Sequence, residues 1–338
     1  MASNKRSTKR PTRPAQQRQN GPRRLGGQAP PTRSASAQRR YERSRRTRRS
    51  SNLQAWAGVL LVVAVVLAFA IYKLTDHTPS SKNGGNLALA PVSVVSELSS
   101  IPASTFNAIG TAKSTDPFTE TSKQPFITAG GKPHVVFVGA EYCPFCALSR
   151  WSLVIALSKF GTFSNLHQTS SNADYAPIPT FSFEGSKYTS PYITFSAYEV
   201  ADRQGNALDV PPHSIDTIFN TYDGVNTTKS KFNASTGVGY PFVDFANQHV
   251  SSGAPRILDN TIPGVAGGGP GGFNGIGYAI AHPTSTTGKA IKATDFIAAA
   301  NYDMAAICAV DGGKPGSICH MSGVKAAAKV MAATKKVS

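Results

Sequence analysis

Two cysteines lie two residues apart in the stretch "GAEYCPFCALSRW", residues 139–151. A thiolate attacks a disulfide and a thiol does not, so an active cysteine needs surroundings that favour its charged form. A helix N-terminus is such a place, because its unpaired N–H groups and its dipole favour negative charge. If a helix begins at Cys143, Pro144 takes the first helical position, where a missing N–H is tolerated. The spacing predicts that Cys143 attacks and that Cys146, one turn further on, resolves the bond.

Two other roles for this pair stay open. A structural zinc site needs four ligands, which the pair would complete with distant side chains. The candidates are Cys308, Cys319, His320 and His282. Zinc is disfavoured because ten residues, rather than two, separate the second pair of cysteines. A purely structural disulfide within the motif is disfavoured too, since so short a loop restrains the unfolded chain little. We expect neither a metal nor a cofactor.

A strand and a helix must position the motif. Residues 135–138 (VVFV) form a short apolar, β-branched run that is typical of a buried strand. Gly139 then begins a turn, and a helix follows that ends at Gly161. Its apolar positions are Leu148, Trp151, Leu153, Ile155, Leu157 and Phe160. The order strand, Cys-x-x-Cys, helix places both sulfurs at the carboxyl end of a buried strand.

The net charge of +17 is concentrated at the N-terminus. Residues 1–50 hold 16 of the 35 Lys and Arg residues and a single acid, Glu42. The remaining residues are nearly neutral, so the charge is not a property of the folded part. Such an Arg-rich tail has almost nothing to bury and should be disordered. It can bind anionic lipid, and the residues that follow it favour lipid over nucleic acid.

An uncharged stretch of 18 residues, 55–72, follows the tail. At about 1.5 Å per residue, a helix of this length covers most of a bilayer core about 30 Å thick. Trp56 and Tyr72 stand near its ends, where aromatic rings prefer the interface. The preceding Arg cluster places the N-terminus in the cytoplasm and the rest of the chain outside the cell membrane. A cleaved signal peptide is the alternative, which the long basic region disfavours.

The sequence divides into five segments on this basis. They are a basic cytoplasmic tail (1–52), a transmembrane helix (53–74), a polar linker (75–90), an extracytoplasmic domain (91–325) and the end of a C-terminal helix with its tail (326–338). Within the domain the patterns predict helical turns interrupted at Pro102 (91–110), two strands joined through Gly185 and Ser186 (177–200), a helix (213–224), and a strand (242–245) that turns at Asn247 into a partner strand. The glycine-rich residues 262–277 are expected to form a mobile loop rather than a phosphate cradle.

The second pair of cysteines flanks a "DGGKPG" turn between two Ala-rich helical segments. Cys308 would end the first helix and Cys319 would begin the second. Because an oxidising compartment lets disulfides persist, a structural disulfide between them is favoured. The alternative is a shuttle that exchanges electrons with Cys143 and Cys146, in which His320 could lower the pKa of its neighbour Cys319.

Strand, Cys-Pro-Phe-Cys, helix, and later a proline that opens a hairpin together resemble the thioredoxin fold. The resemblance implies that Pro241 is a cis-proline facing the motif and that Tyr240, before it, lines a substrate groove with Pro144 and Phe145. The runs "GAEYCPFCALSRWSLVIALSKFGTFSNL", "TSSNADYAPIPTFSF" and "YTSPYITF" also resemble a membrane-linked thioredoxin-like family of archaea and actinobacteria, catalogued as a domain of unknown function. That family brings no established activity.

Two departures from thioredoxin limit what the resemblance carries over. Thioredoxin has a buried acid six residues before its first cysteine, and here that position is Phe137. Glu141 is nearer, but a carboxylate in a turn is expected to be solvated. A large insertion, residues 147–239, separates the motif from the proline and could cover the groove or form a partner surface.

The sequence therefore predicts an α/β, thioredoxin-like domain behind one transmembrane helix, which exchanges thiols and disulfides with exported proteins. The expected partners are those client proteins, membrane lipid and a membrane protein that recycles the pair; nucleic acid is not expected. Two rival functions remain: a non-catalytic thioredoxin-like binding module, in which Cys143 would be buried and unreactive, and an envelope structural protein that acts through its Arg-rich tail.

Overall fold

A computed structural model describes residues 87–112, 118–121, 124–172, 176–222 and 239–333 of the chain. The predicted tail and transmembrane helix lie outside these residues, as does most of the linker. Leu89 and Ala90, at the end of the linker, are attached to the domain: Leu89 forms a β-bridge with His167, and the Ala90 N–H donates to the Leu166 carbonyl. No helix in the described part of the chain is long and apolar enough to cross a membrane.

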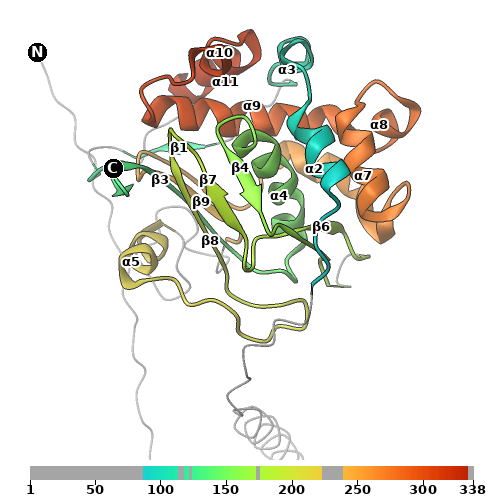
Figure 1. Cartoon of the computed structure of the whole chain (residues 1–338), viewed down its shortest axis with the longest axis horizontal. Helices are drawn as coiled ribbons and strands as arrows, with labels where there is room; N and C mark the ends of the chain where they lie inside the picture. Colours follow the sequence, from blue (N-terminus) through green and yellow to red (C-terminus); the bar gives the residue numbers. More distant parts are fainter. Residues whose placement is uncertain (1–86, 113–117, 122–123, 173–175, 223–238, 334–338) are drawn as a thin grey trace, which may run out of the picture. The chain divides into compact units, whose positions relative to one another are not determined.

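The described residues form a mixed α/β structure on one main sheet (Figure 1). Its central strand is β3 (Lys132–Gly139), which pairs antiparallel with β9 (Phe242–Phe245) and parallel with β8 (Thr194–Glu199). Outside β9 lie β10 (His249–Ser252) and then β1 (Thr119–Glu120), both antiparallel to their neighbours. The short β2 (Thr128–Ala129) pairs with the start of β3. The strand predicted at 135–138 is therefore confirmed as the centre of the sheet.

Helices cover the two faces of this sheet unequally (Figure 1). Those named below are α2 (Val92–Ser99), α3 (Ala103–Ile109), α4 (Pro144–Leu157), α5 (His213–Tyr222), α7 (Gly272–Ala281), α9 (Ala293–Val310), α10 (Gly316–Cys319) and α11 (Ser322–Ala333). The long helix α9 is central, since it contacts α3, α4, α7 and α11 and is buried along most of its length. The helices predicted around Pro102 and on both sides of the "DGGKPG" turn are confirmed, as is the helix predicted at 213–224 over residues 213–222; its last two residues lie outside the described part of the chain.

The central strand separates two apolar cores, because successive side chains of a strand point to opposite faces. Val135 and Phe137 pack into the larger core, which holds α4 and α9. Val136 and Val138 pack into the smaller one, beneath the apolar face of α5. This double burial explains why the run is apolar without alternation. It also fixes the position of the carboxyl end of the strand, where the cysteines follow.

The prediction of two strands in residues 177–200 is wrong, because three are present. They are β6 (Pro179–Ser182), β7 (Lys187–Thr189) and β8. Gly185 and Ser186 do join the first two, but these strands pair with β5 (His167–Ser170) and β4 (Thr162–Ser164) instead of each other. Pro191 lies two residues beyond the end of β7 and has no N–H to donate to a neighbouring strand, so β7 ends before it. The next strand, β8, pairs with β3 instead.

The glycine-rich residues 262–277 do not form the expected loop. They contain α6 (Ile262–Val265), a 3-10 turn (Ala266–Gly268) and the start of α7. Gly277 lies where α7 crosses α2: a Cβ at this position would come within 2.5 Å of a Val94 methyl. Here a glycine lets two helices pack closely. A glycine-rich composition alone does not distinguish such a packed helix from a mobile loop.

The end of α4 differs from its predicted position, whereas the turn between β9 and β10 lies where it was predicted. The helix that follows the cysteines ends at Leu157, earlier than the predicted Gly161. The hairpin of β9 and β10 turns through Ala246 and Asn247, both with positive φ, as predicted. The second strand of that hairpin begins at His249.

Candidate active site

The first motif cysteine lies at the N-cap of α4, directly after the turn that leaves β3. Cys143 has extended backbone angles, Pro144 takes the first helical turn, and the Cys146 N–H donates to the Cys143 Sγ at 3.3 Å. Because the first N–H groups of a helix have no partner within it, this sulfur serves as their acceptor. The local structure thus matches the predicted helix start.

The pKa values of the two thiols are shifted in opposite directions, although both thiols are buried. Both are free in this structure; Cys143 is 7% exposed and Cys146 is 0% exposed. A hydrogen bond from the Cys146 side chain lowers the pKa of Cys143 despite its burial, aided by N-terminal amides of α4 and the charge of Arg150. Burial, together with that same hydrogen bond, raises the pKa of Cys146 well above its usual value. Cys143 therefore ionises more readily than Cys146, which favours Cys143 as the attacking thiol.

The predicted proline loop faces the first cysteine. The Cys143 thiol donates to the Tyr240 carbonyl at 3.7 Å, and the Tyr240–Pro241 peptide bond is cis, as the thioredoxin resemblance implied. Pro144, Phe145 and Tyr240 are half-buried, whereas Pro241 is buried. The Tyr240 ring stacks on Phe219 of α5, with centroids 5.6 Å apart. The structure thus brings together residues from α4, the proline loop and, unforeseen from the sequence, α5.

A buried ion pair lies behind the motif, and sequence reasoning missed it. Arg150 on α4 and Glu199 at the end of β8 are both 0% exposed. The Arg150 Nε donates to Glu199 Oε1 at 2.8 Å, and its Nη2 donates to Glu199 Oε2 at 2.5 Å and to the Ala140 carbonyl at 2.9 Å. Burial alone would lower the pKa of Arg150, but Glu199 raises it above its usual value. A sequence signal was available, because Arg150 is the only charged residue of α4.

The expectation that Glu141 is solvated is wrong. This side chain is 2% exposed and accepts hydrogen bonds from Ser182 Oγ at 2.5 Å and from Thr169 Oγ1 at 3.4 Å. Burial raises the pKa of Glu141, while the bond from Ser182 lowers it. The turn is covered by the β5–β6 hairpin, which supplies both hydroxyls, and no local pattern predicts that cover.

The second pair of cysteines is joined in a disulfide. The Cys308 and Cys319 Cα atoms are 5.6 Å apart, and the bond links α9 to α10. Cys319 ends α10 rather than beginning the last helix, which starts at Ser322 as α11. In the described residues, no three His, Cys, Asp or Glu side chains are grouped so that they could hold a metal ion.

Removing this disulfide should lower stability without removing the motif chemistry. Closing so short a loop stabilises a protein by about 2–3 kcal/mol in the chain-entropy description. We expect the double variant Cys308→Ser, Cys319→Ser to lose about that much free energy of unfolding in a urea titration. Exchange at Cys143 should be retained under native conditions. Unchanged stability would mean that the bond does not restrain the native chain.

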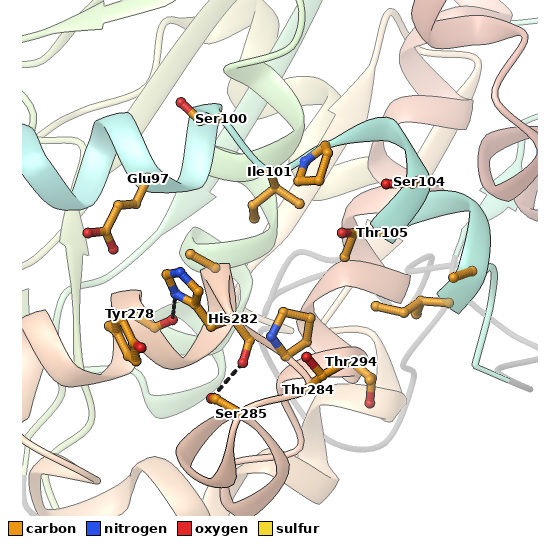
Figure 2. Close-up of a pocket in the computed structure, with 15 residues that line it drawn as sticks. Glu97, Ser100, Ile101, Ser104, Thr105, Tyr278, His282, Thr284, Ser285 and Thr294 are labelled. Atoms are coloured by element: carbon orange, nitrogen blue, oxygen red, sulfur yellow. Dashed lines mark hydrogen bonds between the residues drawn. The ribbon is translucent and has the colours of Figure 1, made fainter.

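A separate surface cleft of about 830 Å³ lies between α2 and α3 on one side and, on the other, α7, the turn that follows it and the start of α9 (Figure 2). Glu97 faces Tyr278 and His282, whose rings stack with centroids 4.2 Å apart. The rest of the lining is mostly small, and many residues carry hydroxyls: Ser100, Ser104, Thr105, Thr284, Ser285 and Thr294. None of the four cysteines lines the cleft, so it is a candidate binding site distinct from the motif.

Comparison with known proteins gives one match. Neither a curated protein nor a solved structure matches the chain. Residues 118–241 match the family model of a domain of unknown function, DUF929. The match covers less than half of the chain, but it contains the motif, both residues of the buried ion pair and the proline loop. This part of the chain is therefore similar to the DUF929 family of domains of unknown function.

Proposed function

We propose that the protein is a membrane-anchored, thioredoxin-like thiol–disulfide oxidoreductase that acts on exported proteins. The observation that carries this proposal is the asymmetry of the motif. Cys143 accepts a helix N-terminal N–H and has a lowered pKa, whereas Cys146 is fully buried behind it with a raised pKa. A purely structural pair of thiols has no need of such a difference.

The exchange balances without a further reactant. The Cys143 thiolate attacks a client disulfide and forms a mixed disulfide, releasing one client sulfur as a thiolate. Cys146, after losing its proton, attacks the Cys143 sulfur, closes the Cys143–Cys146 disulfide and releases the second client thiolate. Two electrons pass from the motif to the client, and the two client thiolates take up protons. The reverse sequence of steps oxidises a client dithiol.

Several features support a thioredoxin-like arrangement. The central strand leads into the motif and α4, and a hairpin opened by Pro241 pairs with that same strand. The loop before the hairpin faces the attacking sulfur through the Tyr240 carbonyl. The motif is thus held between a helix N-terminus and a proline loop, which is the arrangement that the resemblance implies.

A location outside the cell membrane is supported by two independent features. The Cys308–Cys319 disulfide fits an oxidising compartment, where such bonds persist. The uncharged residues 55–72 and the Arg-rich segment before them fit a retained membrane anchor with a cytoplasmic N-terminus. A membrane partner that recycles the motif would then be within reach, and the Arg-rich tail would bind anionic lipid.

The test is thiol trapping, read by mass, on the full chain in detergent micelles after equilibration over a series of glutathione buffers. We expect Cys143 and Cys146 to titrate together and reversibly, because a disulfide forms between them. The Cys143→Ser variant should form no such disulfide, and the matched Cys308→Ser variant should titrate like wild type at the motif. A shift of the midpoint in Cys308→Ser would instead favour an electron shuttle between the two pairs.

The second candidate is a non-catalytic binding module. It is favoured by the small exposed fraction of Cys143, 7%, and by the separate cleft at Glu97 and Tyr278. If the motif thiols neither react nor titrate in the trapping experiment, the oxidoreductase proposal fails and this one replaces it.

A further inference from the structure

One buried donor at the motif has no hydrogen-bond partner within the described part of the chain. The Arg150 guanidinium uses its Nε and Nη2 groups on Glu199 and on the Ala140 carbonyl. Its Nη1 group is buried and has no hydrogen-bond partner among the residues that the structure describes. Leaving a charged N–H unsatisfied in a dry interior is costly, and such an atom calls for an explanation.

Several contacts place this guanidinium next to the resolving cysteine. Arg150 follows Cys146 by four residues on α4, so the two side chains share one face of the helix. The guanidinium lies over the Phe137 ring, 5.5 Å from its centroid. A Cβ at Gly139 would meet both that ring, at 2.6 Å, and the Cys146 Sγ, at 3.0 Å. The ring, the sulfur and the guanidinium are therefore parts of one packed cluster.

Arg150 is also tied to the turn that carries the attacking cysteine. The Ala140 carbonyl accepts both the Arg150 Nη2 and the Cys143 N–H, the latter at 3.2 Å. Because Glu199 binds the guanidinium through two parallel hydrogen bonds, its orientation is fixed as well as its charge.

We propose that Arg150 takes part directly in the thiol–disulfide exchange: its Nη1 group receives the Cys146 thiolate in the resolving step, while Glu199 is the positioning residue that holds the guanidinium in place. This inference rests on the proposed function. It names the group that would allow a fully buried resolving thiol to ionise. Cys146 gives up its proton, which the client thiolate released in the first step finally takes up, in a site without bulk water where an ionised sulfur has few other sources of stabilisation. The thiolate then attacks the Cys143 sulfur of the mixed disulfide, and the client sulfur departs as a thiolate.

Other groups that titrate or carry charge also face this cluster. From the turn come Tyr142, whose pKa is raised by burial and by the two cysteines, and Glu141, whose pKa is raised by burial. Glu199 comes from β8, and its backbone N–H donates to Asp209 at 3.0 Å. Glu184 and Asp209, both with raised pKa values, extend the acidic side of the cluster away from the sulfurs. The charge of Arg150 lowers the pKa of both cysteines, so its removal should raise the pKa of Cys146.

The experiment follows the resolving step alone, on the full chain in detergent micelles. The motif is reduced under conditions that leave Cys308–Cys319 intact, as checked by mass, and is mixed with an aryl disulfide whose thiolate is coloured. The first coloured thiolate reports attack by Cys143, and the second reports attack by Cys146 on the mixed disulfide. The rate of the second release is measured from pH 5 to pH 9, and thermal melting checks that each variant is folded.

Two variants should move the pH midpoint of the second release in opposite directions. Glu199→Gln leaves Arg150 without its counter-charge, so the midpoint should fall and the rate at pH 7 should rise about three- to tenfold. In Arg150→Met, Glu199→Gln both charges are absent, so the midpoint should rise and the rate at pH 7 should fall at least about tenfold. Lys159→Met is the matched control, since it removes a half-buried cation just beyond the far end of α4 and should leave the midpoint unchanged.

The outcomes separate this inference from the proposed function. If wild type releases no second thiolate, the oxidoreductase proposal itself fails. If wild type releases it but the midpoint is the same in both Glu199→Gln and the double variant, Arg150 is merely structural and the inference fails alone. Should the double variant not fold, the direction of the shift in Glu199→Gln still decides, because an unchanged or raised midpoint contradicts the role given to Arg150.

Discussion

Replacing Arg150 by methionine is expected to lower the free energy of unfolding by about 3–5 kcal/mol. The guanidinium and Glu199 are both 0% exposed, so the single change leaves a carboxylate buried without its partner. The double variant Arg150→Met, Glu199→Met should recover most of that loss, because neither charge is then buried and the two side chains can pack against the apolar core. The cycle is measured by urea unfolding at pH 7.

An exposed cation provides the comparison for this cycle. Lys187 lies on β7 and is exposed, so Lys187→Met should change stability by no more than about 0.5 kcal/mol. If Arg150→Met lowers the free energy of unfolding as little as Lys187→Met does, the buried ion pair stabilises the fold less than its geometry indicates. If the double variant is as unstable as the single one, the loss comes from packing around the Arg150 stem rather than from an unpaired charge.

The start of α4 could be predicted from the sequence because its determinants are local. Proline is favoured at the first position of a helix, and the cysteine before Pro144 is then placed at the N-cap. The disulfide between Cys308 and Cys319 was favoured because the two residues flank a short turn in a domain expected to lie in an oxidising compartment. The proline loop came from the resemblance to thioredoxin, and the Tyr240 carbonyl lies at the attacking sulfur as that resemblance implied.

The buried charges could not be predicted because their partners are distant along the chain. Arg150 and Glu199 meet only because β8 pairs in parallel with β3, which places Glu199 opposite Gly139 at the carboxyl end of the motif strand. Glu141 is buried only because Ser182 and Thr169 arrive on a hairpin that the sequence did not reveal. A lone charge on an otherwise apolar helix was the one local sign of this cluster.

Another buried carboxyl group lies in the core, between two helices. Asp303 of α9 is 2% exposed, and no described residue forms a hydrogen bond with its Oδ2 atom. Ser152 of α4 is its neighbour, and burial raises the pKa of Asp303 to about 8 despite a hydrogen bond with that serine. Asp244 of β9 is also buried, with a pKa raised to about 7. In the native chain Asp303 and Asp244 are therefore still protonated in mildly acidic solution, as is Glu184, whose pKa is raised to about 7.

The stability of the protein should consequently fall as pH rises towards 8. In the unfolded chain Asp303 loses its proton near pH 3.8, whereas in the native chain it keeps it to about pH 8. Between these values the native state binds one more proton than the unfolded state, so each pH unit lowers the free energy of unfolding by about 1.4 kcal/mol. The contribution is complete below the unfolded pKa and is lost once pH exceeds the folded one. Asp244 adds the same slope, but only up to about pH 7.

The two carboxyl groups can be separated by urea unfolding at half-unit intervals from pH 5 to pH 9, with the disulfide kept oxidised. Asp303→Asn should be more stable than wild type at pH 8 by several kcal/mol, because an amide carries no charge to bury, and the difference should grow up to that pH. For the matched variant Asp244→Asn, the difference in free energy of unfolding from wild type should grow only up to about pH 7 and stay constant above it. Parallel curves for wild type and Asp303→Asn throughout this range would mean that Asp303 is already ionised in the native core, with the α4–α9 interface open to water at that point.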